Sequence, residues 1–251
     1  MDPMLGMLFL VFAAGAGGGG MPEPGPTGPI PQTGGSKGLK LLRTEAERAG
    51  LSDDWTTFLA AVAYHESRWN PSVGLGLPGR IEVPGISLNE GKHGAWEAKA
   101  AVMAYDRNED EFKQCPWPRM RYGFGSGGWF GLLPANALWS FKGTPGFCMD
   151  PQKAVFDPWS SLVLGTDYAR RLMRWKSFKA GGATWKVLNR GWAAPGNMDG
   201  TPAERVAKTD ERWEKALKAL GVPSSWGNRK VTKLPTGWDA WDVYTAGLET
   251  A

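Results

Sequence analysis

The stretch that decides the fold is residues 59–71, which read LAAVAYHESRWNP. Four of its residues are spaced at i, i+3, i+4 and i+7 and therefore share one face of a predicted helix. They are Leu59, Val62, Ala63 and Glu66. The face is otherwise apolar, so the sequence predicts a carboxyl group that points towards the protein core.

The ends of this helix are also marked in the sequence. Ser52 is a typical N-cap residue, and the aspartates at positions 53 and 54 place negative charge in the first turn, where it is favourable. Asn70-Pro71 predicts the end of the helix, because proline cannot continue it. The helix is therefore expected to carry its carboxyl group in the last turn.

Glu66 is a candidate general acid. Burial disfavours the charged form of a carboxyl group and raises its pKa. A carboxylic acid that is still protonated near neutral pH is the proton donor that a glycosidic oxygen needs. The alternative is structural: a Glu66 that pairs with a buried arginine would also be a perturbed carboxyl group.

Four short motifs resemble those of the soluble lytic transglycosylase family, which is related to goose-type lysozyme. Residues 66–71 (ESRWNP) resemble its Glu-Ser-x-aromatic-Asn-Pro motif, and residues 128–134 (GWFGLLP) resemble its Gly-x-x-Gly-Leu turn. Residues 157–172 look like its Asp-Pro helix, and residues 187–191 (VLNRG) are similar to its Tyr-Asn-Ala-Gly motif. The motifs occur in the family's order and cover roughly residues 50 to 195.

The chain departs from the family pattern at two places. The second motif usually continues Leu-Met-Gln, whereas this chain reads Leu132-Leu133-Pro134, and Asn136 is the nearest amide. The fourth motif lacks its tyrosine, because position 188 is leucine. Both changes affect expected saccharide contacts, and neither affects the acid.

The resemblance implies a mainly α, lysozyme-like fold and a reaction that one glutamate carries out alone. Glu66 would protonate the oxygen between N-acetylmuramic acid and N-acetylglucosamine of peptidoglycan, and then take the proton of the sugar's 6-hydroxyl to close a 1,6-anhydro ring. No cofactor and no metal ion are implied. The expected substrate-binding residues are Ser67, Trp129, Gly131, Leu132, Asn136, Asn189 and Trp192.

Most of these residues also have a structural interpretation. The Ser67 hydroxyl could bond back to the helix backbone, Asn189 could satisfy a loop, and Gly131 could serve packing alone. Trp129 and Trp192 fit a sugar-stacking role and a core role equally well, because an indole offers apolar area with a polar edge.

Two other functions remain open. A hydrolytic lysozyme on the same fold would need a second carboxylate, for which Glu82, Glu90 and Asp106 are candidates. A structural or wall-binding protein, such as a phage virion component, would have a cleft without activity. The corresponding locations are the bacterial cell envelope and a virion that delivers the protein to it.

Composition limits the kinds of partner that the protein is expected to bind. The net charge is +4 and no run of five or more Lys/Arg occurs, which favours an anionic polymer such as a cell wall over nucleic acid. The pair Cys115 and Cys148 could form a disulfide or remain as two thiols. His65-Glu66 begins like the zinc-protease pattern His-Glu-x-x-His, but position 69 is tryptophan, so a metal site is not expected.

The chain is expected to have three parts. Residues 1–36 combine an apolar run, too short to span a membrane, with a Gly/Pro-rich linker. The apolar run, within residues 1–20, is either signal-like or a tip that contacts a membrane or a larger assembly. Residues 37–221 form the catalytic domain, interrupted by an insertion at about 76–122 that is a candidate cleft wall. Residues 222–251 are a Trp-rich tail that wraps the domain or meets a partner.

Five further helices are expected within the domain. Their signals are apolar periodicity, an Asp-Pro start at position 157 and a Thr-Pro-x-Glu capping box at position 201. The expected ranges are 39–49, 96–107, 157–178, 183–189 and 202–220.

Overall fold

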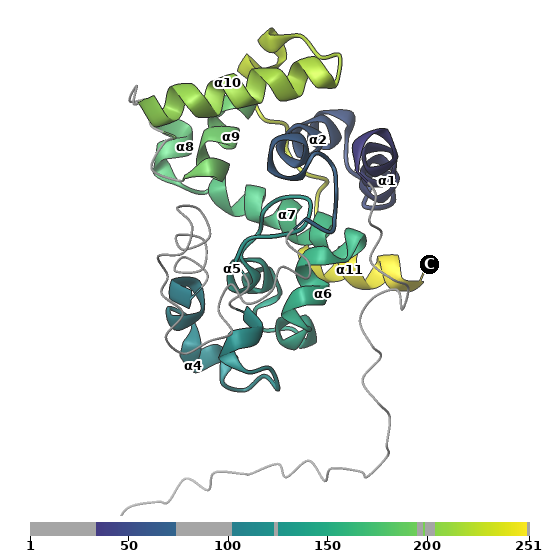
Figure 1. Cartoon of the computed structure of the whole chain (residues 1–251), viewed down its shortest axis with the longest axis vertical. Coiled ribbons are helices and arrows are strands. Elements are labelled where there is room, and N and C mark those ends of the chain that lie inside the picture. Colours follow the sequence, from purple (N-terminus) through teal and green to yellow (C-terminus); the bar gives the residue numbers. More distant parts are fainter. Residues whose placement is uncertain (1–33, 74–101, 123–124, 195–197, 199–203, 250–251) are drawn as a thin grey trace, which may run out of the picture.

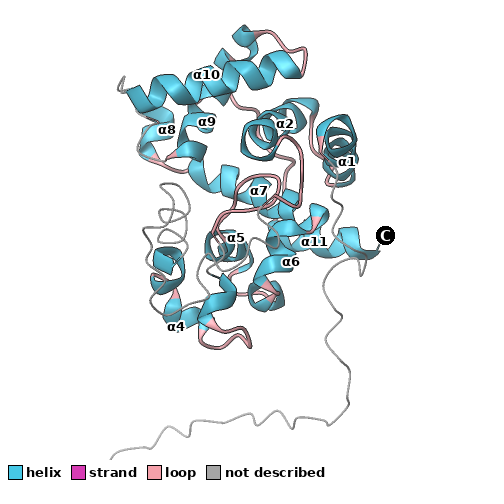
Figure 2. Cartoon of the chain, in the orientation of Figure 1, coloured by secondary structure: helices cyan, strands magenta, loops and turns pink. Residues whose placement is uncertain are grey.

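The computed structural model of the protein describes residues 34–73, 102–122, 125–194, 198 and 204–249. The predictions for residues 1–33, for Glu82 and Glu90, for the first half of the helix 96–107 and for the capping box at 201–203 lie outside these residues. The described chain is mainly helical, which confirms the mainly α part of the predicted fold class (Figures 1 and 2). β pairing within it is confined to two isolated bridges.

The α-helices differ widely in length, and short 3-10 turns connect several of them (Figure 2). The α-helices are α1 (Gly35–Arg48), α2 (Asp53–Ser67), α4 (Glu109–Phe112), α5 (Pro134–Leu138), α6 (Pro151–Phe156), α7 (Pro158–Leu172), α8 (Lys176–Ala180), α9 (Trp185–Ala193), α10 (Glu204–Ala219) and α11 (Ala240–Glu249). The 3-10 turns are η1 (Arg119–Tyr122), η2 (Trp139–Phe141), η3 (Pro145–Cys148) and η5 (Ser224–Asn228).

Helix α7 runs through the middle of the molecule (Figure 1). It is buried on all sides from Pro158 to Asp167, as expected of a core helix. Its start is as predicted: Pro158 occupies the first turn, and the Asp157 carboxylate accepts a hydrogen bond from the Ser160 backbone N–H at 2.9 Å. The predicted end near residue 178 is wrong. The chain leaves the helix at Leu172 and starts α8 after a turn.

Helix α2 also begins where the sequence predicted and ends earlier. Ser52 is its N-cap residue, although its side chain makes no capping hydrogen bond. The helix stops at Ser67, because Arg68 and Trp69 adopt left-handed backbone angles with φ of 55° and 61°. The Asn70 side chain then accepts hydrogen bonds from the backbone N–H and the hydroxyl of Ser72, at 3.0 and 2.8 Å, which closes the following turn.

The C-terminal segment 222–249 lies along the helical domain. Trp226 stacks on Trp185 with ring centroids 5.4 Å apart. The backbone carbonyl of Thr232 accepts a hydrogen bond from the Trp55 indole at 3.1 Å. Farther along, the Tyr244 carbonyl accepts one from the Trp159 indole at 3.0 Å, which ties α11 to α7. These buried indoles are satisfied by backbone from this segment, so the segment completes the core.

Aromatic side chains in residues 102–122 form a small core of their own. Phe112 stacks on Phe147 at 4.4 Å and lies 4.7 Å from the ring of Tyr122. Tyr105 is buried beside both, and the Trp117 indole donates to the Cys148 carbonyl at 2.9 Å. In the described half of the insertion, these rings therefore serve packing and do not present a stacking surface for sugar.

A disulfide joins Cys115 to Cys148, which decides between the two alternatives that the sequence left open. It links residues 33 positions apart and fixes the small aromatic core against η3. A cross-link of this loop length stabilises mainly by restricting the unfolded chain.

Replacing both cysteines by serine is expected to lower the free energy of unfolding by roughly 2–4 kcal/mol, because the unfolded chain regains its loop entropy. Urea unfolding of the oxidised protein and of the double variant measures the difference. The reductant-treated double variant is the control and should not change further. Equal stability of the oxidised protein and the variant would contradict the prediction.

Candidate active site

Glu66 lies in the last turn of α2, at the edge of the core and not inside it. Leu59, Val62 and Ala63 on the same face are fully buried, whereas 33% of the Glu66 side-chain surface is accessible. The sequence predicted that this carboxyl group points into the core, whereas the structure places it at the edge of the core. The last turn of α2 extends beyond the core, and its carboxyl group meets a loop there.

That loop is the Gly-x-x-Gly-Leu turn. Gly127 and Leu132 exchange two backbone hydrogen bonds of 3.1 and 3.0 Å, which close the turn between them. Gly128 and Gly131 have φ of 71° and 58°, a region that glycine enters without strain. The turn is therefore built on its glycines.

A buried tryptophan fastens this turn to the end of α2. The Trp129 indole donates a hydrogen bond to the Trp69 carbonyl at 3.1 Å, and the Trp69 indole donates to the Ala60 carbonyl at 2.8 Å. Because Trp69 directly follows the helix, the two indoles tie the turn to the segment that carries the carboxyl group.

Gly131 lies directly against the Glu66 carboxyl group. A methyl group added at its α-carbon would sit 2.8 Å from Glu66 Oε2 and 3.4 Å from Glu66 Cδ. No side chain other than hydrogen fits there without moving the carboxyl group. The first and second motifs therefore meet in space, although Glu66 and Gly131 are 65 positions apart in the sequence.

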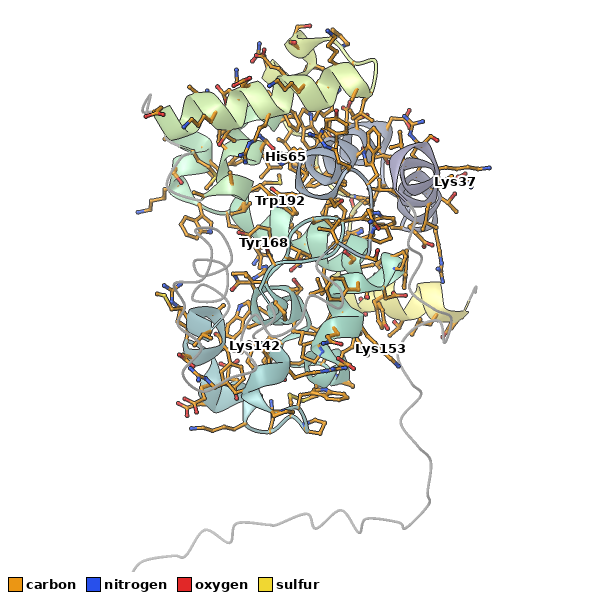
Figure 3. All side chains as sticks on the ribbon, viewed as in Figure 1. Lys37, His65, Lys142, Lys153, Tyr168 and Trp192 are labelled. Carbon is orange, nitrogen blue, oxygen red and sulfur yellow. A yellow bond between two sulfur atoms is a disulfide. The ribbon has the colours of Figure 1, made fainter. Side chains whose placement is uncertain are left out.

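A row of aromatic residues continues from the turn. The Trp192 indole donates to the Phe130 carbonyl at 3.2 Å, so α9 is joined to the residue before Gly131. The Trp192 ring meets the Tyr168 ring edge-on at 5.0 Å, and the Arg171 guanidinium lies 5.4 Å from the Tyr168 ring. Figure 3 shows Trp192 and Tyr168 below His65. The motif-bearing helices α2, α7 and α9 thus converge on one place.

Several predicted substrate-binding residues are buried and act as supports. Trp129 and Asn189 are fully buried, and Leu132 has 3% of its surface exposed. The Ser67 hydroxyl donates back to the Ala63 carbonyl at 2.9 Å. For Trp129 and Ser67 the structural interpretation therefore replaces the predicted direct contact with sugar. The reason is local: each polar atom finds a backbone carbonyl at the end of α2.

The other predicted substrate-binding side chains differ in their burial and in their hydrogen bonds. Both polar atoms of the Asn189 side chain are buried and have no hydrogen-bond partner in the described chain, which contradicts the expectation that it satisfies a loop. Trp192 retains 8% exposure at the edge of the site. Asn136 is half-buried in α5, and its backbone carbonyl accepts a hydrogen bond from Arg171 at 2.7 Å.

Sequence reasoning did not include Tyr168 and Arg171 among the site residues. The signal was present, because they are spaced at i and i+3 on the helix that follows Asp157-Pro158. Their relation to Trp192 depends on how α7 and α9 pack, which the spacing does not specify.

His65 stands beside the carboxyl group. Its Nε2 atom is 3.3 Å from Glu66 Oε1, and only 7% of its side chain is accessible. Burial, and to a lesser extent the positive charges of Arg212 and Arg68, lower the pKa of His65 to about 4. At neutral pH the imidazole is therefore uncharged, and Glu66 has no imidazolium next to it.

The buried histidine predicts a pH-dependent stability. An unfolded chain binds a proton at His65 below about pH 6.5, whereas the folded chain does so only near pH 4. The unfolded state therefore binds more protons between these values, and the free energy of unfolding falls as the pH falls through this window. We expect His65 to contribute a loss of about 2 kcal/mol between about pH 7 and pH 5.

Urea unfolding of the wild type and of His65→Gln at both pH values measures this contribution. The variant should show a smaller loss of stability on acidification, whatever its stability at neutral pH. An equal loss in both proteins would contradict the assignment.

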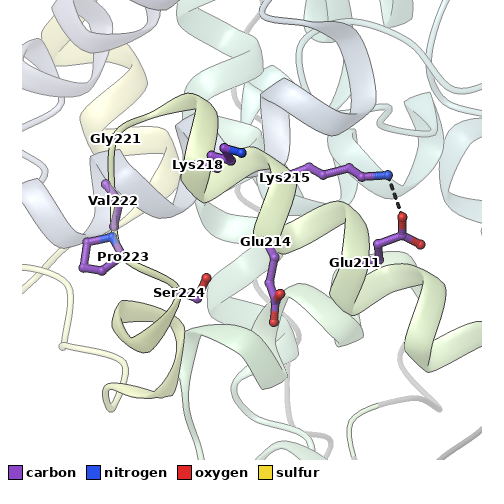
Figure 4. Close-up of a pocket in the computed structure, with 8 residues that line it drawn as sticks. All are labelled: Glu211, Glu214, Lys215, Lys218, Gly221, Val222, Pro223 and Ser224. Carbon is purple, nitrogen blue, oxygen red and sulfur yellow. Dashed lines mark hydrogen bonds and ion pairs between the residues drawn. The ribbon is translucent and has the colours of Figure 1, made fainter.

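The described chain also bears on metal binding, on membrane spanning and on recesses outside the candidate site. It contains no group of three or more His, Cys, Asp or Glu side chains that could hold a metal ion. None of the helices it describes is both long and apolar enough to cross a membrane. A recess of about 640 Å³ lies between the end of α10 and η5 (Figure 4), where Lys215 and Glu211 form an ion pair of 2.6 Å, and it contains none of the predicted site residues.

Comparison with known proteins returned no match: no family model, no curated protein and no solved structure is similar to this chain.

Proposed function

We propose that the protein is a peptidoglycan lytic transglycosylase with a lysozyme-like domain, and that Glu66 is its acid and base. The observation that carries the proposal is the contact of the Glu66 carboxyl group with Gly131. It joins the first two of the four motifs that resemble the family. It also leaves the carboxyl group accessible, as a proton donor must be.

In the proposed reaction Glu66 gives its proton to the glycosidic oxygen between N-acetylmuramic acid and N-acetylglucosamine. The bond from C1 of the muramic acid to that oxygen breaks, and the substrate's acetamide stabilises the cation. The Glu66 carboxylate then removes the proton of the 6-hydroxyl, whose oxygen bonds to C1. The glutamate returns to its acid form, and no water is consumed.

The pairing of the described carboxylates near the motifs favours a mechanism with one catalytic carboxyl group over a mechanism with two. Asp106 forms a bidentate pair with Arg119, with both bonds at 2.9 Å. Asp157 caps α7, and Asp167 is 2% exposed and paired with arginines of the same helix. Each of these carboxylates is engaged in the fold, whereas a hydrolytic lysozyme needs a second one free for the water. The other two candidates, Glu82 and Glu90, lie outside the described residues.

The proposed location is the bacterial cell envelope, reached by export or on a virion, because the proposed substrate occurs there. Peptidoglycan strands are its proposed partner. Residues 1–20 are proposed to contact a membrane or a larger assembly.

Zymography on purified cell walls tests the proposal. The full chain is expected to clear a gel that contains peptidoglycan, and the heat-unfolded protein should not. A folded full chain that binds walls without clearing them would favour the structural, wall-binding alternative.

A further inference from the structure

Trp175 stands out among the tryptophans because it is exposed. It has 51% of its surface accessible, whereas most other tryptophans in the described chain are buried. It lies in the turn between α7 and α8, and it makes no ring contact or side-chain hydrogen bond with the described residues. An indole left in water in this way is an unused apolar surface of large area.

Three cations surround this indole in the sequence. Arg174, Lys176 and Lys179 are exposed and form no ion pair with other described residues. No acidic residue occurs between positions 168 and 198. Other basic residues of the segment have acidic partners: Arg170 and Arg171 of α7 pair with Asp167, and Lys186 and Arg190 of α9 pair with Asp210. The turn therefore carries three positive charges that have no acidic partner among the described residues.

The turn also directly follows the end of α7 that carries residues of the candidate active site. Tyr168 and Arg171 are spaced at i and i+3 in the last turns of α7, which ends at Leu172, and the Trp175 N–H bonds to the Leu172 carbonyl at 3.1 Å. At a rise of 1.5 Å per residue, the end of α7 lies roughly 6 Å along the helix from Tyr168, and Trp175 follows three residues later. Two linked sugar rings can span such a distance.

We propose that Arg174, Trp175, Lys176 and Lys179 form a distal binding site for an anionic glycan strand. The Trp175 ring would stack on a sugar face, and the three cations would pair with carboxylates of the peptides attached to the strand. This inference rests on the proposed function, because it places on this site the same strand that reaches Glu66. It adds a second point of attachment that short fragments cannot use.

The structure offers a matched control on the other side of the molecule. Lys37, Lys40 and Arg43 on α1 are exposed and form no ion pair among the described residues. Helices α1 and α8 lie on opposite sides of the view in Figure 1, and Figure 3 labels Lys37 on the α1 side. Replacing these three residues by glutamine changes the net charge as much as replacing the three cations beside Trp175.

Co-sedimentation with insoluble peptidoglycan measures the affinity, in full-length chains that also carry Glu66→Gln so that the wall stays intact. Trp175→Ala should weaken binding about 3- to 10-fold, as expected for loss of one aromatic contact. Trp175→Phe should keep most of the affinity. The variant with Arg174, Lys176 and Lys179 changed to glutamine should bind more weakly and depend less on salt, whereas the α1 control should bind as the parent does.

Two results would overturn the inference. One is unchanged wall binding by folded Trp175→Ala. The other is an equal loss in the α1 control, which would mean that net charge alone attracts the wall. Vesicles containing anionic phospholipid form a separate arm: Trp175-dependent binding to vesicles without Trp175-dependent binding to walls would assign the turn to a membrane and contradict the proposal.

Two further measurements distinguish a failure of this inference from a failure of the proposed function. In the chain with an intact Glu66, a defect of Trp175→Ala confined to long strands, with short muropeptide fragments cleaved normally, supports the distal site. Wall binding that needs Trp175 in a protein that never cleaves walls would retain the site and reject the transglycosylase.

Discussion

Glu66→Gln is expected to remove wall-lytic activity by at least the ~10²–10⁴-fold that positioned acid–base groups contribute. The glutamine keeps the size and shape of the side chain and lacks the proton. Its amide would occupy the space against Gly131, so the turn between Gly127 and Leu132 should stay intact. Turbidity loss of a cell-wall suspension measures the activity, and thermal unfolding checks the fold.

Glu47→Gln is the matched control for this change. Glu47 is exposed on α1, away from the second motif, and its neutralisation alters the net charge equally. It should lyse walls as the wild type does. A folded Glu66→Gln protein with near-normal lysis would remove Glu66 from the mechanism.

Gly131→Ala is expected to lower activity about 10²-fold while the protein stays folded. The new methyl group would lie 2.8 Å from Glu66 Oε2 and would displace the carboxyl group. A displacement of about 1 Å at a reacting group can cost a factor of 10² in rate. The backbone also pays for a left-handed alanine, by roughly 1–2 kcal/mol of stability.

Gly50→Ala separates the two effects. Gly50 also has a positive φ, 66°, and a methyl group there would meet nothing within 4 Å. Its variant should lose similar stability and retain its activity. If Gly131→Ala and Gly50→Ala had equal activities, the contact between Gly131 and the carboxyl group would have no part in catalysis.

Local signals in the sequence predicted where helices begin better than where they end. Asp157-Pro158 marks the start of α7, because the cap and the fixed proline φ act within one turn. The ends of α2 and α7 depend on contacts from elsewhere. Trp69 lies beyond its helix and bonds with Ala60 and Trp129, and Phe178 is buried in α8, after the chain has turned away from α7 at Leu172. Spacing along one helix does not contain this information.

In the candidate site, too, some features could be predicted from the sequence and others depend on tertiary contacts. The meeting of Glu66 with Gly131 follows from the resemblance of two motifs, and the structure brings the two residues together. The roles of the tryptophans could not be read from composition, because a buried and a sugar-stacking indole look alike in sequence. Trp129 is an anchor because a free backbone carbonyl lies within reach, whereas Trp175 has no such partner among the described residues.

The partial exposure of Glu66 was missed for a related reason. Helical periodicity assigned it to the buried face, which is correct for Leu59 two turns earlier and for Val62 one turn earlier. Periodicity does not say where the core stops along that face. The core stops one turn before Glu66, and the carboxyl group is left at an accessible edge beside the buried, uncharged His65.

Mass spectrometry of the sugars released from purified peptidoglycan by the full chain tests the central claim most directly. If Glu66 acts as acid and then as base on the 6-hydroxyl, the muramic acid ends will carry a 1,6-anhydro ring. They will then be lighter, by the mass of one water molecule, than the ends that hydrolysis leaves. Reducing muramic acid ends without the anhydro form would contradict the account, because water and not the 6-hydroxyl would then have closed the reaction.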